Sequence, residues 1–107
     1  MPPYRVLVSE EATRERRRLS ATQDKKLLWW RDRLSEDPMV GDSIRKELIP
    51  TSLRRAYSVD NLWRLELPEA WRVVYTIATK PGSRPEVLLL RILTHKEYDR
   101  LFGYSTS

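Results

Sequence analysis

The sequence predicts an α+β domain: a small antiparallel or mixed β-sheet with an N-terminal helical hairpin packed on it and a short C-terminal helix. Two alternating segments around a short loop predict a β-hairpin over residues 61–78, and an apolar segment predicts a covered strand over 86–94. Helix-capping signals precede the expected helices at Ser9, Ser20 and Thr94. The length of 107 residues leaves room for one domain, residues 1–107.

The hairpin segment, NLWRLELPEAWRVVYTIA, is the most informative part of the chain because its register can be tested by counting. Side chains alternate between the two faces of a strand. A three-residue loop at 68–70 matches every facing pair in character: Leu67 with Trp71, Leu65 with Val73, Trp63 with Tyr75 and Glu66 with Arg72. A two-residue loop sets Leu65 against Arg72 and is rejected, since a one-residue slip moves every side chain to the other face. The face away from the core then carries Arg64, Glu66 and Arg72.

The segment before the hairpin predicts one strand and two helices. Residues 4–9, YRVLVS, alternate weakly and predict the first strand. Ser9 is suited to cap a mostly polar helix whose first turn is acidic. Ser20 begins a second helix through a capping-box pattern with Gln23. That helix ends before Asp37-Pro38, and its apolar stripe consists of Leu27, Trp30 and Leu34.

Residues 38–60 give weaker signals. Gly41-Asp42 indicates a turn, and SIRKELIP indicates a short helical or extended piece that Pro50 ends. Thr51 and Ser52 are suited to cap one further turn through LRRAY.

The C-terminal part is clearer. After a loop at 80–85, the segment 86–94 is apolar on both parities apart from Arg91, which predicts a central strand covered on both sides. Thr94 and Glu97 form a second capping box and open a helix over 95–102 that Gly103 ends. The predicted order is therefore strand, two helices, three strands and a short helix.

Composition limits the partners and the chemistry. The net charge is +5, and fifteen of the twenty basic residues are Arg, which favours a polyanion or an acidic protein as partner. The chain has no Cys and one His, so we expect no disulfide, no metal site and no cofactor. No apolar run is long enough for a membrane span, and the N-terminal MPPYRVLVSEE lacks the features of a signal peptide. We expect a cytoplasmic protein with no membrane partner.

Three phrases, GDSIRKELIP, NLWRLELPEAWRVVYTI and HKEYDRLFGY, together with the order of elements, resemble the RelE/ParE toxin superfamily, and most closely the RelE-like toxins of type II toxin-antitoxin systems. The resemblance covers essentially the whole chain and is densest over residues 41–104. It implies a RelE-like fold and an mRNA interferase, a ribosome-dependent endoribonuclease that cuts mRNA in the ribosomal A site and inhibits translation. It also implies a cognate antitoxin that silences the toxin in a hetero-oligomer.

The implied reaction is metal-free: the ribose 2′-OH attacks the adjacent phosphate and leaves a 2′,3′-cyclic phosphate and a 5′-OH. It requires a base, cations on the phosphate and an acid at the leaving oxygen. The resemblance gives the catalytic roles to Arg72 on the phosphate, Glu66 as base and His95 as acid. His95 and Tyr98 stand closer together than in the commoner His-x4-Tyr pattern of the superfamily. The implied RNA-binding residues are Arg64, Lys46, Lys96 and Tyr98.

Each of these residues also has a purely structural interpretation. Glu66 with Arg72 is then a cross-strand ion pair worth about 0.2 to 1 kcal/mol. His95 is then an exposed residue at a helix start. Arg91 is either a buried partner for a carboxylate or a residue of the active face. The run 15–18 is either a solvated helix face or a contact with ribosomal RNA or another polyanion. Trp29 is either part of the core edge or a docking site for a partner's apolar helix.

Two other functions remain open at the level of the sequence. A ParE-like protein disables DNA gyrase by contact and cleaves nothing. A RelE-fold protein without activity persists as a partner-binding component. Both share the predicted fold, so the site residues and functional assays separate them.

Overall fold

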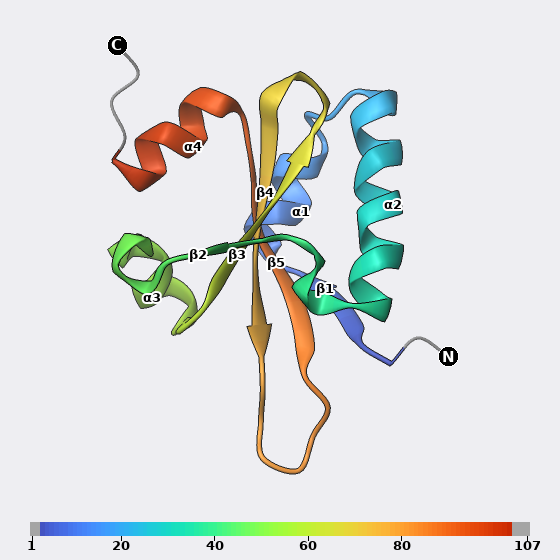
Figure 1. Cartoon of the computed structure of the whole chain (residues 1–107). Helices are drawn as coiled ribbons and strands as arrows, with labels where there is room; N and C mark the ends of the chain where they lie inside the picture. The colour runs from blue at the N-terminus through green and yellow to red at the C-terminus, as the bar shows by residue number, and fades with distance from the viewer. Residues whose placement is uncertain (1–2, 104–107) are drawn as a thin grey trace.

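The computed structural model describes residues 3–103, which form a five-stranded mixed β-sheet with helices around it (Figure 1). The sheet order is β1-β5-β4-β3-β2, in which β1 runs parallel to β5 and all other neighbours are antiparallel. The strands are β1 Arg5–Val8, β2 Asp42–Ile44, β3 Leu62–Leu67, β4 Trp71–Ala78 and β5 Glu86–Leu93. The helices are α1 Glu10–Arg16, α2 Ala21–Glu36, α3 Thr51–Tyr57 and α4 His95–Phe102. The predicted α+β class is confirmed.

The hairpin of β3 and β4 has the predicted register. Leu67 faces Trp71, Leu65 faces Val73, Trp63 faces Tyr75 and Glu66 faces Arg72. The connecting turn is Pro68–Ala70, and its residues Glu69 and Ala70 have φ of 65° and 62°. This left-handed backbone is uncommon outside glycine and reverses the chain within three residues.

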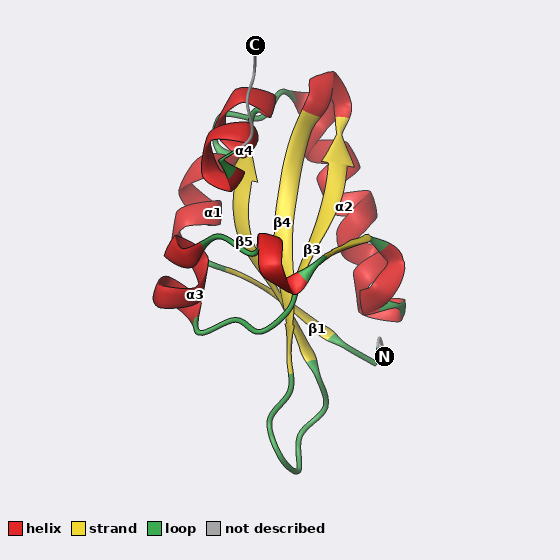
Figure 2. Ribbon diagram, turned by 60° about the vertical axis from the view of Figure 1, so that its left-hand side comes forward, coloured by secondary structure: helices red, strands yellow, loops and turns green. Residues whose placement is uncertain are grey.

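The two faces of the sheet carry two separate apolar clusters. Figure 2 shows α2 on one side of the sheet and α3 with α4 on the other. On the α2 side, Leu27 and Leu34 pack with strand residues such as Val73, which is fully buried. On the opposite side, Leu53 of α3 and Tyr98 of α4 pack with strand residues that include Leu62, Val74, Leu90 and Leu93. Both faces of β4 and β5 are therefore covered along much of their length.

The predicted capping interactions are present. The Ser9 hydroxyl accepts a hydrogen bond from the Ala12 N–H at the start of α1. Complete capping boxes begin α2 at Ser20 and α4 at Thr94, and Gly103 ends α4 with φ of 74°. Side chains thus satisfy backbone donors that a helix start leaves unpaired.

The region over residues 38–60 differs from the prediction. It contains an additional strand, β2, whose antiparallel pairing with β3 the predicted order of elements lacks. The piece 46–48 is a single 3₁₀ turn, and Thr51 is the first residue of α3 instead of its cap. Gly41 is required by packing, because a Cβ there would lie 2.7 Å from the Tyr75 hydroxyl and 2.8 Å from the Arg64 carbonyl oxygen.

The N-terminal helices contact different strands. Helix α1 packs mainly against β5, whereas α2 packs against β1 and β3. An ion pair between Arg16 and Asp24 connects the end of α1 to the first turn of α2. No helix in residues 3–103 is both long and apolar enough to cross a membrane.

Candidate functional site

The hairpin brings Arg64, Glu66 and Arg72 to one face at the turn end of β3 and β4, as the alternation predicts. The prediction that this face lies away from the core is wrong, because Val74 on the same face belongs to the apolar cluster on the α3/α4 side. Arg64 lies opposite Val74, and Glu66 lies opposite Arg72. The three side chains differ in exposure: 31% for Arg64, 60% for Glu66 and 15% for Arg72. We call this group, together with Tyr98, the arginine cluster.

Tyr98 connects the two guanidinium groups. The Cζ atoms of Arg64 and Arg72 each lie 5.8 Å from the centroid of the Tyr98 ring. Arg64 Nη1 also donates to the Tyr98 hydroxyl at 3.4 Å. The ring itself is buried, stacks on Phe102 and belongs to the α3/α4-side cluster. It acts as a platform on which two cations converge.

Each arginine of the cluster has one carboxylate nearby, but neither pairing is a two-pronged one. Arg64 Nη2 lies 3.3 Å from Asp42 Oδ2, and Arg72 Nε lies 3.8 Å from Glu66 Oε1. Arg72 Nη1 donates to the Ala70 carbonyl at 2.8 Å. The Nε atoms of both arginines are buried without a hydrogen-bond partner among residues 3–103. Buried donors are normally satisfied, so the protein leaves the hydrogen-bonding capacity of these two guanidinium groups incompletely used.

The arginine cluster keeps its positive charge. Burial acts to lower the pKa of Arg64, but the Tyr98 hydroxyl and Asp42 outweigh burial, and the pKa of Arg64 is raised. Two arginines in this arrangement present N–H donors suited to the oxygens of a phosphate or a carboxylate.

His95 lies at the same end of the sheet. Arg72 faces Leu93 across β4 and β5, and His95 follows Leu93 by two residues as the first residue of α4. His95 also precedes Tyr98 by three residues, a spacing that places the two on adjacent turns of one helix face. Its side chain is 56% exposed, and Nε2 lies 3.2 Å from Oδ2 of Asp99, whose side chain is 12% exposed.

The structure separates the two predicted lysines. Lys96 is exposed in the first turn of α4, next to His95. Lys46 lies two residues beyond Ile44, which faces Leu62 at the start of β3, so the chain at Lys46 runs away from the hairpin turn. Lys46 therefore lies outside the arginine cluster, and its contact with RNA stays a prediction.

Arg91 and the basic run 15–18 form ion pairs within the protein. Arg91 is bound by Glu15, with Nη2 2.8 Å from Oε2. Of the two interpretations of Arg91, the structure therefore shows the one in which it is the partner of a carboxylate. In the basic run 15–18, Arg16 pairs with Asp24 and Arg18 pairs with Glu97. This run is therefore a set of intramolecular ion pairs more than a freely solvated helix face.

The sequence prediction missed three charged pairs near the site, which involve Asp42, Arg18 with Glu97, and Asp99. Asp42 lies on β2, a strand that was not predicted, and the Arg18–Glu97 pair joins residues 79 positions apart. The third, Asp99, carries a signal in the sequence, because it stands four residues after His95 and helical spacing brings such residues together.

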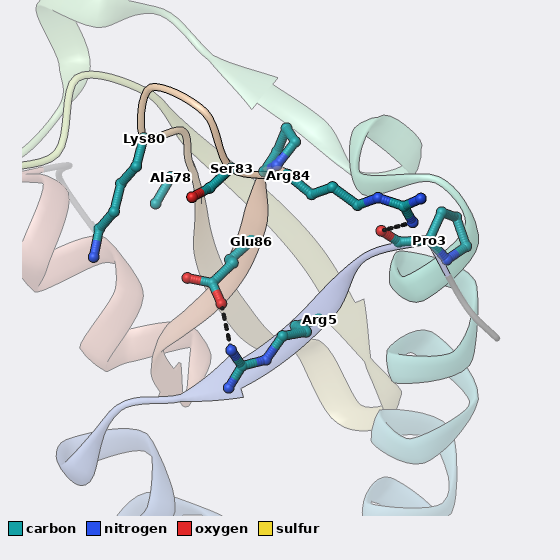
Figure 3. Close-up of a pocket in the computed structure, with 8 residues that line it drawn as sticks. Pro3, Arg5, Ala78, Lys80, Ser83, Arg84 and Glu86 are labelled. Carbon is teal, nitrogen blue, oxygen red and sulfur yellow. Dashed lines mark hydrogen bonds and ion pairs between the residues drawn. The ribbon is translucent and has the colours of Figure 1, made fainter.

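Other hollows lie away from the arginine cluster. A pocket of about 440 Å³ lies at the opposite end of the sheet, where β4 ends and β5 begins. In Figure 3, both arginines that line it are engaged by neighbouring residues: Arg5 pairs with Glu86, and Arg84 donates to the backbone carbonyl of Pro3. Across residues 3–103, no group of three His, Cys, Asp or Glu side chains is placed to hold a metal ion.

Comparison with solved structures identifies the architecture. The intact E. coli RelBE toxin-antitoxin complex contains a chain with 16% identity and a TM-score of 0.58, which covers 85% of this chain and 95% of its own length. A free double mutant of the E. coli toxin RelE has 17% identity and a TM-score of 0.61, and the match covers 94% of this chain and 90% of that chain. The chain has the RelE fold.

A further structure with the RelE fold is the archaeal RelE-RelB complex from Pyrococcus horikoshii OT3, with 16% identity, a TM-score of 0.55, and coverage of 89% of this chain and 97% of that chain. No protein-family model and no curated protein matches the chain. The match to the RelE fold over most of both chains confirms the fold that the sequence resemblance implied.

Proposed function

We propose that this protein is the toxin of a type II toxin-antitoxin system and cleaves mRNA on the ribosome. The observation that carries the proposal is the convergence of the Arg64 and Arg72 guanidinium groups on Tyr98, where the Nε donor of each forms no hydrogen bond within residues 3–103. A phosphodiester supplies the anionic acceptor oxygens that such donors require. The RelE fold supports the same assignment, since the solved neighbours are described as toxins.

In the proposed reaction, Arg72 and Arg64 stabilise the charge that grows on the phosphate oxygens during attack by the 2′-OH. Glu66 takes the proton of the 2′-OH, for which its exposed carboxylate is suited. His95 gives a proton to the departing 5′-oxygen. The bond from phosphorus to the 2′-oxygen forms and the bond to the 5′-oxygen breaks, so the products are a 2′,3′-cyclic phosphate and a 5′-OH.

The remaining predicted residues have supporting roles in this proposal. Lys96 beside His95 contacts the RNA backbone, and Lys46 contacts it away from the arginine cluster. Tyr98 acts through the arginines, because its ring is buried beneath them. The proposed partners are the ribosome with its mRNA in the cytoplasm, and a cognate antitoxin. Two of the solved neighbours are RelE in complex with RelB, which supports an antitoxin partner.

The direct test is cleavage of mRNA on programmed ribosomes by the purified protein. The wild-type protein should cut in the A site, and Arg72→Ala should not. Arg84→Ala is the matched control, because Arg84 is an exposed arginine at the opposite end of the sheet. Intact mRNA together with inhibition of DNA supercoiling by gyrase would support the ParE-like alternative instead.

A further inference from the structure

Arg18 lies just after the end of α1, and its side chain reaches α4. Its Nη1 and Nη2 atoms lie 2.9 Å from Oε2 and Oε1 of Glu97, a two-pronged pairing. Nη2 also donates to the Ile92 carbonyl at 3.1 Å, and the guanidinium Cζ lies 5.0 Å from the centroid of the Trp71 ring. One side chain thus contacts β4, β5 and α4.

Each contact of Arg18 lies next to a residue of the proposed site. Trp71 precedes Arg72 in β4, and Ile92 precedes Leu93, which faces Arg72. Glu97 is the third residue of α4, whose first residue is His95. Arg18 therefore connects the strand that holds the phosphate-binding arginine to the helix that holds the imidazole.

Glu97 transmits this connection to the helix start. Its Oε1 atom accepts a hydrogen bond from the Thr94 N–H at 2.9 Å, and the Thr94 hydroxyl accepts from the Glu97 N–H. The same carboxylate thus closes the capping box and binds Arg18. The orientation of the first turn of α4, and with it His95, depends on both interactions.

We propose that Arg18 is a positioning residue for RNA cleavage: through Glu97 and Trp71 it sets the placement of His95 relative to Arg72. This inference rests on the proposed function. The positioning role adds to the proposed site a residue, Arg18, that contacts none of the reacting groups. A small displacement of a catalytic group is sufficient to reduce the rate of a reaction strongly.

Arg16 provides a matched control for Arg18. Both arginines belong to the same run, and both pair with a carboxylate at similar exposure: 37% and 35% for Arg16 and Asp24, 41% and 35% for Arg18 and Glu97. The Arg16 pair, however, joins α1 to α2 and not to α4. Arg16→Ala therefore controls for the loss of one arginine–carboxylate pair, and only Arg18→Ala should affect the site.

The experiment compares the two variants in hydrogen exchange and in kinetics. In Arg18→Ala, amide exchange over 95–102 should speed up, and kcat on programmed ribosomes should fall by ~10-fold or more with KM changed less than ~2-fold. Arg16→Ala should keep both at the wild-type level. Arg18→Lys, which keeps the charge but not the two-pronged geometry, should restore part of kcat.

Equal exchange over 95–102 in the two alanine variants, or equal kcat, would overturn the positioning role. If the wild-type protein cleaves no RNA, the proposed function fails, and the exchange comparison alone then decides whether Arg18 holds α4 in place.

Discussion

Glu66 and Arg72 face each other across β3 and β4, with 3.8 Å between Oε1 and Nε, yet their side chains are 60% and 15% exposed. The carboxylate therefore lies in solvent while the guanidinium is held beneath it against Tyr98. An ion pair of this length is weak, since exposed pairs contribute about 0 to 1 kcal/mol. The arrangement leaves the arginine available to a stronger anion and the carboxylate available to a proton.

Glu66→Gln distinguishes a base from a simple ion-pair partner. We predict that RNA cleavage falls by roughly 10² to 10⁴ because the amide cannot take the 2′-OH proton. The free energy of unfolding should change by less than about 1 kcal/mol. Glu69→Gln, in the adjoining turn, is the control and should leave cleavage unchanged. Normal cleavage by Glu66→Gln would assign Glu66 to structure alone.

His95→Gln should reduce kcat by a similar factor of about 10² to 10⁴, because glutamine cannot protonate the leaving oxygen. Asp99→Asn should have a smaller effect in the same direction, since Asp99 orients the imidazole at 3.2 Å. Both are measured as single-turnover cleavage rates on programmed ribosomes over a range of pH. A wild-type rate for His95→Gln would remove His95 from the mechanism.

The Arg18–Glu97 pair predicts a pH dependence of stability. Hydrogen bonding from Arg18 is the main cause that lowers the pKa of Glu97 from 4.5 to about 2. Because the pKa in the folded state is below the unfolded value, the stabilisation is present above pH 4.5 and is lost as the pH falls toward about 2. Urea unfolding between these values should show a shallower loss of stability for Glu97→Gln than for the wild type. Parallel curves would contradict the prediction.

Tyr75→Phe should destabilise the fold by about 1 to 3 kcal/mol through lost hydrogen bonds alone. The buried Tyr75 hydroxyl donates to the Pro38 carbonyl at 2.7 Å and accepts from the Gly41 N–H at 3.1 Å, and burial raises the pKa of Tyr75 to about 12. Phenylalanine leaves both backbone groups unpaired. Tyr57→Phe, which removes a 3.3 Å bond to Glu11 and an interaction with Ser9 at a less buried hydroxyl, should cost about 0.5 to 1 kcal/mol. Equal losses in denaturant unfolding would contradict this.

Local sequence patterns predicted the hairpin well for a clear physical reason. In the segment 61–78 four of the five facing pairs match in polarity in the observed register, and a one-residue slip would set Leu65 against Arg72, so alternation and loop length agree. The capping boxes at Ser20 and Thr94 were also predictable from the sequence, because each joins residues three positions apart. The partnership of Arg91 with a carboxylate followed from a lone charge on an apolar strand.

The features that the sequence did not predict depend on contacts between distant residues. β2 has three residues and becomes a strand by pairing with β3, which local propensity does not reveal. Asp42 joins Arg64 through that pairing, and Arg18 joins Glu97 across the sheet edge. The burial of Tyr98 between the apolar cluster and two guanidinium groups likewise required the packing of α4.

The central claim is that the arginine cluster stabilises the phosphate of an mRNA during its cleavage. The most direct measurement is the chemistry of the RNA ends after incubation with programmed ribosomes. We expect A-site fragments with a 2′,3′-cyclic phosphate and a 5′-OH for the wild type and for Arg84→Ala, and a rate lower by about 10² to 10³ for Arg72→Ala. Fragments produced equally fast by Arg72→Ala, or no fragments from the wild type, would contradict it.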